Sequence, residues 1–167
     1  MHVAIANIIA LIASILMVYS GMIKKKQKVL YIQSIQIGLL VISNLVLNGL
    51  SGAIINAISF VRNILCYKDK LGLKEKIVIT ISSILLIIYF NNLGLIGLLP
   101  LISSIVYLWL MTIKEIKKFK MLIIFTMILW GVYDFTIQSY TSFIFDILTI
   151  LTNTISIIRI KGVERDE

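Results

Sequence analysis

The chain alternates between long apolar runs and short polar connections. The seven apolar runs cover approximately residues 3–22, 29–48, 50–67, 77–93, 95–113, 121–138 and 141–160. Each has 17 to 20 residues, close to the roughly 20 that an α-helix needs to cross a hydrocarbon core of about 30 Å. The runs are about twice as long as a transmembrane β-strand and lack its strict alternation. The pattern therefore predicts seven transmembrane helices.

The composition is that of a membrane protein. Of the 167 residues, 59% are hydrophobic and 14% are charged, with a single proline, cysteine and histidine. A soluble domain has roughly a quarter of charged residues, because it must cover its core with polar side chains. Disorder, a collagen-like fold and a disulfide scaffold are excluded by the same counts. We expect one all-α integral membrane domain over residues 1–167, surrounded by the lipid bilayer.

The 16 basic residues, which give a net charge of +8, fall in four clusters at alternate connections. They are Lys24, Lys25, Lys26, Lys28, Arg62, Lys68, Lys70, Lys74, Lys76, Lys114, Lys117, Lys118, Lys120, Arg159, Lys161 and Arg165. Since Lys and Arg are retained on the cytoplasmic side during insertion, we expect an outer amino terminus, a cytoplasmic carboxyl terminus and an odd number of spans. Topology and anionic headgroups account for the charge, so no nucleic-acid partner is expected.

Two parts of the chain carry related residues. Residues 11–15 (LIASI) recur 90 positions later as residues 101–105 (LISSI), and at the same offset Asn44 corresponds to Asp134 and Asn48 to Gln138. Residues 56–62 and 153–159 share the pattern N-x-I-S-x-x-R at an offset of 97. The seven extra residues are predicted near the outer connection between the sixth and seventh helices.

These matches predict an internal repeat in which two bundles of three helices have the same orientation across the membrane. The first repeat covers residues 3–67 and the second covers residues 95–160. A linker helix at residues 77–93 joins them. The two bundles are then expected to be related by an axis along the membrane normal.

Residues 54–58, 98–102 and 153–159 resemble segments of the YgjV family of bacterial inner-membrane proteins, and the resemblance extends over nearly the whole chain. It implies a location in the bacterial inner membrane but little about function. The plan of three helices, a linker and three helices is also similar to the SWEET sugar transporters and the wider PQ-loop group. The Pro-Gln dipeptide of that group is absent here, and Pro100 has Ala10 as its repeat partner.

In SWEET-like proteins an asparagine on the third helix of each bundle faces a central substrate site, so the resemblance implies this role for Asn56 and Asn153. The residues themselves agree, because polar groups at membrane depth point toward protein or water rather than lipid. On the last helix Asp146, Thr149, Asn153 and Ser156 form one stripe. An amide suits hydroxyl-rich or otherwise neutral polar solutes. The alternative is that these side chains join helices by hydrogen bonds.

Asp134 and Asp146 are the acidic residues within the predicted spans, and both fall in the outer half of the membrane. An intramembrane carboxyl group indicates either a protonatable coupling group or a solute contact. The alternative is an interfacial carboxylate hydrated by the outer headgroups, with Tyr133, Tyr140 or Gln138 as a hydrogen-bond partner.

Other polar and aromatic residues give weaker indications of function. Trp130 lies deep enough to stack on a sugar-like ring, although it could equally pack between helices. Arg62 lies near an inner helix end, where we expect it to anchor at the cytoplasmic surface, with an inner gate as the alternative. His2 and Cys66 are solitary, whereas a metal or thiol site needs several ligands or a partnered nucleophile. No metal, cofactor or catalytic residue is therefore expected, and the protein is not expected to be an enzyme.

Taken together, these patterns favour a transporter that passes a small polar solute by alternating access between the two bundles. The candidate solute contacts are Asn56, Asn153, Trp130, Asp134 and Asp146. The alternative is a non-transporting membrane component that packs against partner membrane proteins. The solute, the coupling ion and the assembly into a homo-oligomer stay open at this stage.

Overall fold

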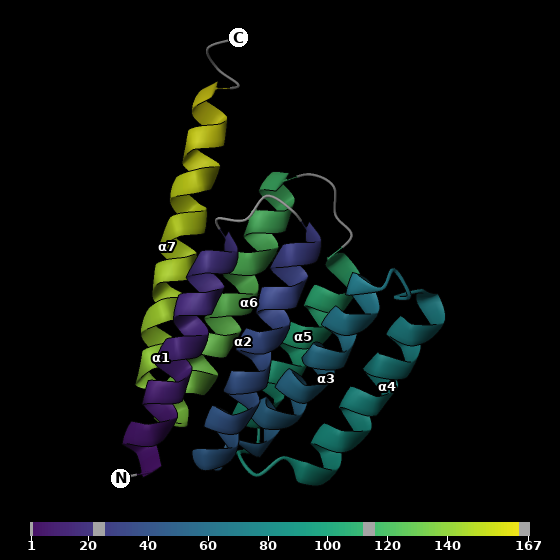
Figure 1. Ribbon diagram of the computed structural model, residues 1–167. Coiled ribbons are helices and arrows are strands. Elements are labelled where there is room, and N and C mark those ends of the chain that lie inside the picture. Colours follow the sequence, from purple (N-terminus) through teal and green to yellow (C-terminus); the bar gives the residue numbers. More distant parts are fainter. Residues whose placement is uncertain (1, 22–25, 112–115, 164–167) are drawn as a thin grey trace.

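The computed structural model describes residues 2–21, 26–111 and 116–163, which form helices and no strands (Figure 1). The elements are α1 (His2–Gly21), α2 (Lys26–Val46), α3 (Leu50–Tyr67), α4 (Leu73–Phe90), η1 (Ile96–Leu98), α5 (Leu99–Leu110), α6 (Ile116–Thr136) and α7 (Tyr140–Val163). The prediction of an all-α protein is confirmed for the described residues. Lys24, Lys25, Lys114 and Arg165 of the predicted basic clusters lie outside them.

The apolar run at residues 95–113 is divided between the 3-10 turn η1 and the helix α5. Gly94, which precedes η1, has a φ of 57°, a left-handed conformation that favours glycine. Pro100 lies in the first turn of α5, where its missing N–H would have no partner in the helix in any case. α5 consequently has only 12 residues.

Within the described residues, two helical stretches are long and apolar enough to cross a membrane by length and composition. They are His2–Tyr19, with a mean hydropathy of 2.2, and Leu50–Tyr67, with a mean hydropathy of 1.3. Shorter apolar stretches occur at Leu30–Val46, Ile96–Leu110 and Tyr140–Ile155. α4 and α6 begin with turns rich in lysine, which shortens their apolar parts. The crossing of the membrane by all seven helices therefore stays a prediction from the sequence pattern.

The distribution of side chains is inverted relative to a water-soluble protein. Large apolar side chains are exposed on every helix, for example Ile8 on α1, Ile88 on α4 and Ile155 on α7. Among the described residues, buried polar or charged side chains outnumber buried apolar ones. This arrangement fits apolar surroundings, in which polar groups must find partners inside the protein.

Six of the helices form two rows of three. In the amino-terminal row α1 packs on α2 and α2 on α3, and in the carboxyl-terminal row α5 packs on α6 and α6 on α7. The rows are joined at both ends, by contacts of α1 with α7 and of α3 with α5. α4 packs on α3 and α5 and lies on the far side of the molecule from α1 and α7 (Figure 1).

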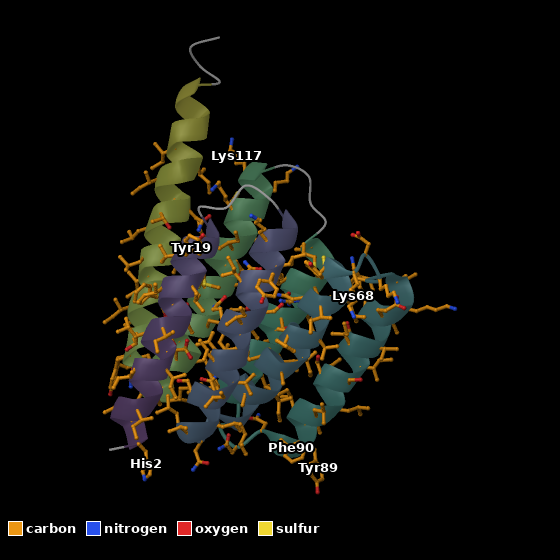
Figure 2. The ribbon with its side chains drawn as sticks, viewed as in Figure 1. His2, Tyr19, Lys68, Tyr89, Phe90 and Lys117 are labelled. Atoms are coloured by element: carbon orange, nitrogen blue, oxygen red, sulfur yellow. The ribbon has the colours of Figure 1, made fainter. Side chains whose placement is uncertain are left out.

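The two ends of the helix bundle differ in charge. Lys68 and Lys117 lie toward one end, which we call the basic end, whereas His2, Tyr89 and Phe90 lie at the opposite one (Figure 2). α6 runs from the basic end, and α3 runs toward it. The α2–α3 and α6–α7 connections therefore both lie at the opposite end, which we call the turn end.

Candidate functional site

The α2–α3 and α6–α7 connections have the same backbone structure at positions 90 residues apart. Asn48 and Gln138 both adopt left-handed conformations, with φ of 59° and 62°. The N–H of Gly49 donates to the carbonyl of Asn44 at 2.8 Å, and the N–H of Ser139 donates to that of Asp134 at 2.8 Å. The N–H of Asn48 also donates to the carbonyl of Leu45 at 3.1 Å, and that of Gln138 donates to the carbonyl of Phe135 at 3.2 Å, which completes a Schellman C-cap in both places.

Because the two turns match, the helices that follow them also begin 90 residues apart, α3 at Leu50 and α7 at Tyr140. The prediction that seven extra residues lie at the α6–α7 connection is therefore wrong, because the Schellman hydrogen bonds give both turns the same length. Counted at this offset of 90, Asn56 lies at the position of Asp146, and Asn44 lies at that of Asp134. Asn153, which the shared N-x-I-S-x-x-R pattern paired with Asn56, lies at the position of Asn63 at this offset.

Asn56 and Asp146 share an unusual property. Their side chains are only 5% and 7% exposed, yet the Nδ2 atom of Asn56 and the Oδ2 atom of Asp146 have no hydrogen-bond partner. A buried polar atom without a partner costs about 1–3 kcal/mol. Matched positions of the two rows thus each present an unsatisfied polar atom inside the protein, one a donor and one a carboxyl oxygen.

The structure brings Asp134 and Asp146 together. Asp134 on α6 and Asp146 on α7 are 6% and 7% exposed, and these two helices pack against each other. Gly131 leaves room beside the pair, since a Cβ atom built there would lie 3.7 Å from Asp146 Oδ2. Both carboxyl groups therefore lie inside the protein where α6 packs on α7.

Tyr133 connects the two rows. Its side chain on α6 is fully buried, and its hydroxyl oxygen accepts a 2.7 Å hydrogen bond from the N–H of Gly52 in the first turn of α3. A Cβ atom at Gly52 would lie 2.6 Å from the Tyr133 ring, and one at Gly49 would lie 2.8 Å from its hydroxyl. Sequence reasoning considered Tyr133 only as a partner for the acids. The small residues at positions 49 and 52 were the signal for this close approach.

The other predicted site residues have different surroundings. Trp130 lies one turn from Tyr133, with the ring centroids 5.8 Å apart and the planes perpendicular, and it packs on the cluster of Ile55, Ile87 and Leu101. Asn153 is half-buried and donates from Nδ2 to the Thr149 carbonyl of its own helix at 2.8 Å. The described contacts do not join Asn153 to Asn56. The side chain of Ser156 lies outside the described ones.

A cavity of about 360 Å³ opens at the turn end. Its walls are the matched ends of α2 and α6, with three further residues: Val46, Leu47, Asn48, Thr136, Ile137, Gln138, Val3, Asn92 and Leu93. None of these lining residues is charged. Ile137 of this wall lies close to Gly49, and Tyr133 lies one helical turn earlier on α6, with its hydroxyl also close to Gly49. The cavity, which we call the vestibule, is therefore a hollow with a neutral lining at the turn end.

Arg62 corrects a prediction at the basic end. It is 7% exposed rather than extended to the surface, and its guanidinium lies over the Tyr107 ring, 5.0 Å from the centroid. Its Nε and Nη2 atoms donate to Asn63 Oδ1 at 3.3 and 3.2 Å. An aromatic face and a side-chain carbonyl replace the aqueous contacts that snorkelling would have supplied.

Comparison with known proteins places the chain in a membrane. The family model Imp-YgjV, described as bacterial inner membrane protein, matches residues 4–164, which is nearly the whole chain. No curated protein and no solved structure matches the chain. The family confirms the expected resemblance and the inner-membrane location.

Proposed function

We propose that the chain, which belongs to the Imp-YgjV family of bacterial inner membrane proteins, passes a small neutral polar solute between its two rows by alternating access. In this proposal all seven helices cross the membrane. The basic end faces the cytoplasm, because Lys and Arg are retained there during insertion. The amino terminus and the vestibule then lie on the outer side.

The proposal of an internal repeat is supported by helix packing. If α1, α2 and α3 correspond to α5, α6 and α7, then the α1–α7 contact corresponds to the α5–α3 contact, and both exist. The Schellman turns at Asn48 and Gln138 lie at corresponding positions, and a further turn of this type, at Asp69, follows α3. Two bundles at residues 3–67 and 95–160, joined by α4 from the predicted linker at 77–93, would permit one bundle to rock against the other.

The observation that carries the proposal is the pair of unsatisfied buried atoms, Asn56 Nδ2 and Asp146 Oδ2. Both would gain a partner if a hydroxyl or amide of a solute entered between the rows. Trp130 and Asp134 are adjacent contacts in this proposal, and Asn153 lies about two turns further along α7. The neutral lining of the vestibule suits an uncharged solute.

Closure of the route is supported by the Tyr133 contact. The Tyr133 hydroxyl and the Gly52 N–H lie on different rows and meet below the vestibule. In an alternating-access cycle this hydrogen bond would break when the rows separate at the outer side. The described conformation is then closed beneath its outer vestibule.

A second candidate, a non-transporting component that packs against partner membrane proteins, is favoured by one observation. The Tyr133 ring fills the space over Gly49 and Gly52 so closely that even a methyl group would clash there. A dry, closely packed interior is what this second function requires.

A solute-uptake screen in a deletion strain, followed by uptake into vesicles, tests the transport proposal. Asn56→Ala should reduce uptake of the identified solute, whereas Ala57→Val, a change on the exposed neighbouring position, should leave it intact. An equal effect of both variants, or normal uptake of every solute by Asn56→Ala, would reject the site. If no solute is taken up in a strain-dependent way, the packing function takes its place.

A further inference from the structure

We infer that Asp134 and Asp146 form an exchangeable proton site that is reached from the turn end through the hydroxyls of Ser139 and Ser142. The site belongs to the carboxyl-terminal row alone. Its ligand is a proton delivered from the aqueous phase beside the vestibule.

The burial of the acid pair favours a bound proton. Burying an ionised carboxylate without a paired charge costs far more than burying the neutral acid. Asp134 and Asp146 are 6% and 7% exposed, on two helices that pack against each other. Asp146 Oδ2 has no hydrogen-bond partner, so no donor stabilises a negative charge on this oxygen.

The titratable groups on the surrounding helices are engaged elsewhere or lie at helix ends. Tyr133 on α6 has its hydroxyl bonded to Gly52. Tyr107 of α5 lies against Arg62 of α3. On α1, His2 begins the helix and Tyr19 is exposed near its other end, while on α7 Tyr140 is exposed in the first turn. The side chain of Asn44 on α2, which approaches Tyr133 and Gly52, is neutral.

A second observation gives the pair a route to water. Ser139 directly follows Gln138, a wall of the vestibule, and its Oγ donates to Ser142 Oγ at 2.9 Å. Both serines are buried, and Ser142 lies one helical turn before Asp146, on the same side of α7. Beyond them, Asp146 Oδ2 is buried without a partner. Two hydrogen-bonded hydroxyls thus lie between the wall residue Gln138 and Asp146, whose Oδ2 has no partner.

The amino-terminal row provides an internal control. At the positions that match Asp134, Ser139, Ser142 and Asp146 it carries Asn44, Gly49, Gly52 and Asn56. Amide side chains and glycine do not take up or release a proton in the ordinary pH range, and they have no hydroxyl that could relay one. Around the same backbone turn, one row therefore has all four proton-handling side chains, and the other has none of them at the positions 90 residues away.

The proton site itself does not depend on transport. If the proposed function also holds, proton uptake at Asp146 would alter the carboxyl group that contacts the solute and so link proton entry to solute entry. That coupling rests on the proposed function and is tested separately.

The wild-type protein, purified and reconstituted in lipid nanodiscs, provides the first test by infrared spectroscopy. We expect an absorption band of a protonated carboxyl group that shifts in D₂O and disappears in Asp134→Asn and in Asp146→Asn. It should persist in Asp69→Asn, which removes an exposed carboxyl group of the α3–α4 connection. A band that is absent, or that does not shift in D₂O, would overturn the site even without any variant.

Labelling with dicyclohexylcarbodiimide provides the second test. The carboxyl O–H adds across a C=N bond of the reagent, with the oxygen bonding to carbon and the proton moving to nitrogen, so only a protonated carboxyl group reacts. We expect mass spectrometry to find the label on Asp134 or Asp146, with a yield that falls as the pH rises. A yield set by Na⁺ at constant pH would replace the proton site with a cation site.

The route is tested with Ser139→Gly/Ser142→Gly, which gives the second row the glycines of the first. The deuterium shift should still occur but more slowly than in the wild type, and an unchanged rate would reject the serine route. A proton site in a protein that takes up no solute would sustain this inference while the transport proposal fails. Solute uptake without the infrared band or the label would sustain the transport proposal and overturn the proton site.

Discussion

The amino-terminal row, α1 to α3, and the carboxyl-terminal row, α5 to α7, share one backbone turn but differ in chemistry. Both reverse direction through the same Schellman turn, at Asn48 and at Gln138. Inside the turn, however, the first row has amides and glycines where the second has carboxyls and hydroxyls. The comparison teaches that backbone hydrogen bonds determine the register of the two rows, whereas the side chains at a few matched positions determine what each row can bind.

The rows also cap each other's helices. The first turn of α3 has no side-chain cap of its own, and its Gly52 N–H is bonded by Tyr133 of the opposite row. The first turn of α7 has its Thr141 N–H bonded by Asn7 of α1. Each third helix is thus capped by the other row, but by a phenol in one case and an amide in the other.

The largest effect is expected at Gly52. Gly52→Val should lower the free energy of unfolding by about 3 kcal/mol or prevent assembly, because overpacking typically costs 1–3 kcal/mol and the new Cβ would lie 2.6 Å from Tyr133 and Asn44. Thermal unfolding in detergent measures this. Gly38→Ala is the matched control, since nothing lies within 4 Å of the Cβ position there. Tolerance of valine at 52 would show that the rows are not closely packed.

Tyr133→Phe should have the next largest effect. It leaves the Gly52 N–H buried without its partner, which costs about 1–3 kcal/mol, while the ring that packs on Trp130 is kept. Unfolding measurements should show the loss, and Tyr31→Phe, at an exposed position, should show none. An unchanged stability of Tyr133→Phe would mean that the hydrogen bond between the rows does not stabilise the closed arrangement.

Asn7→Ala tests the cap that α1 provides for the first turn of α7. Asn7 Oδ1 accepts from the Thr141 N–H at 2.9 Å, and its Nδ2 donates to the Gln138 carbonyl at 3.1 Å. Loss of a helix cap typically costs about 1 kcal/mol, a smaller effect than at the buried Tyr133 because Asn7 is half-exposed. If Asn7→Ala destabilised more than Tyr133→Phe, the α1–α7 contact would be the stronger junction.

Gln138→Asn should have the smallest effect and the opposite sign. Residue 138 has a φ of 62°, a conformation that asparagine adopts more readily than glutamine. The change copies Asn48 of the first row and should raise the free energy of unfolding by about 0.5 kcal/mol. The reverse change, Asn48→Gln, should lower the free energy of unfolding by a similar amount. If both variants changed the free energy of unfolding in the same direction, the two turns would not be equivalent.

Several features of the fold could be predicted from the sequence because they depend on hydrophobic periodicity. The helices follow from the length of the apolar runs, and the offset of 90 had already paired Asn48 with Gln138, the two left-handed residues that follow α2 and α6. The division of η1 from α5 was not predicted, since it depends on the conformation of Gly94.

The site was predicted less completely. Asp134 and Asp146 were identified because carboxyl groups in apolar runs are rare, but their burial depends on how α6 packs on α7. The pairing of Asn56 with Asn153 followed shared letters at an offset of 97, whereas the two matching turns lie 90 residues apart. Tyr133 was underestimated because a tyrosine on an apolar helix has no sequence signal that says which neighbour it faces.

Cysteine accessibility between the rows tests the central claim most directly. With Cys66 replaced by alanine, Asn56→Cys and the adjacent, outward-facing Ala57→Cys are treated in native vesicles with a water-soluble thiol reagent. The transport account predicts that Cys at position 56 is modified and that Cys at position 57, facing lipid, is not. Protection of position 56 in vesicles of either orientation would contradict the account and leave a dry interior whose polar groups only hold helices together.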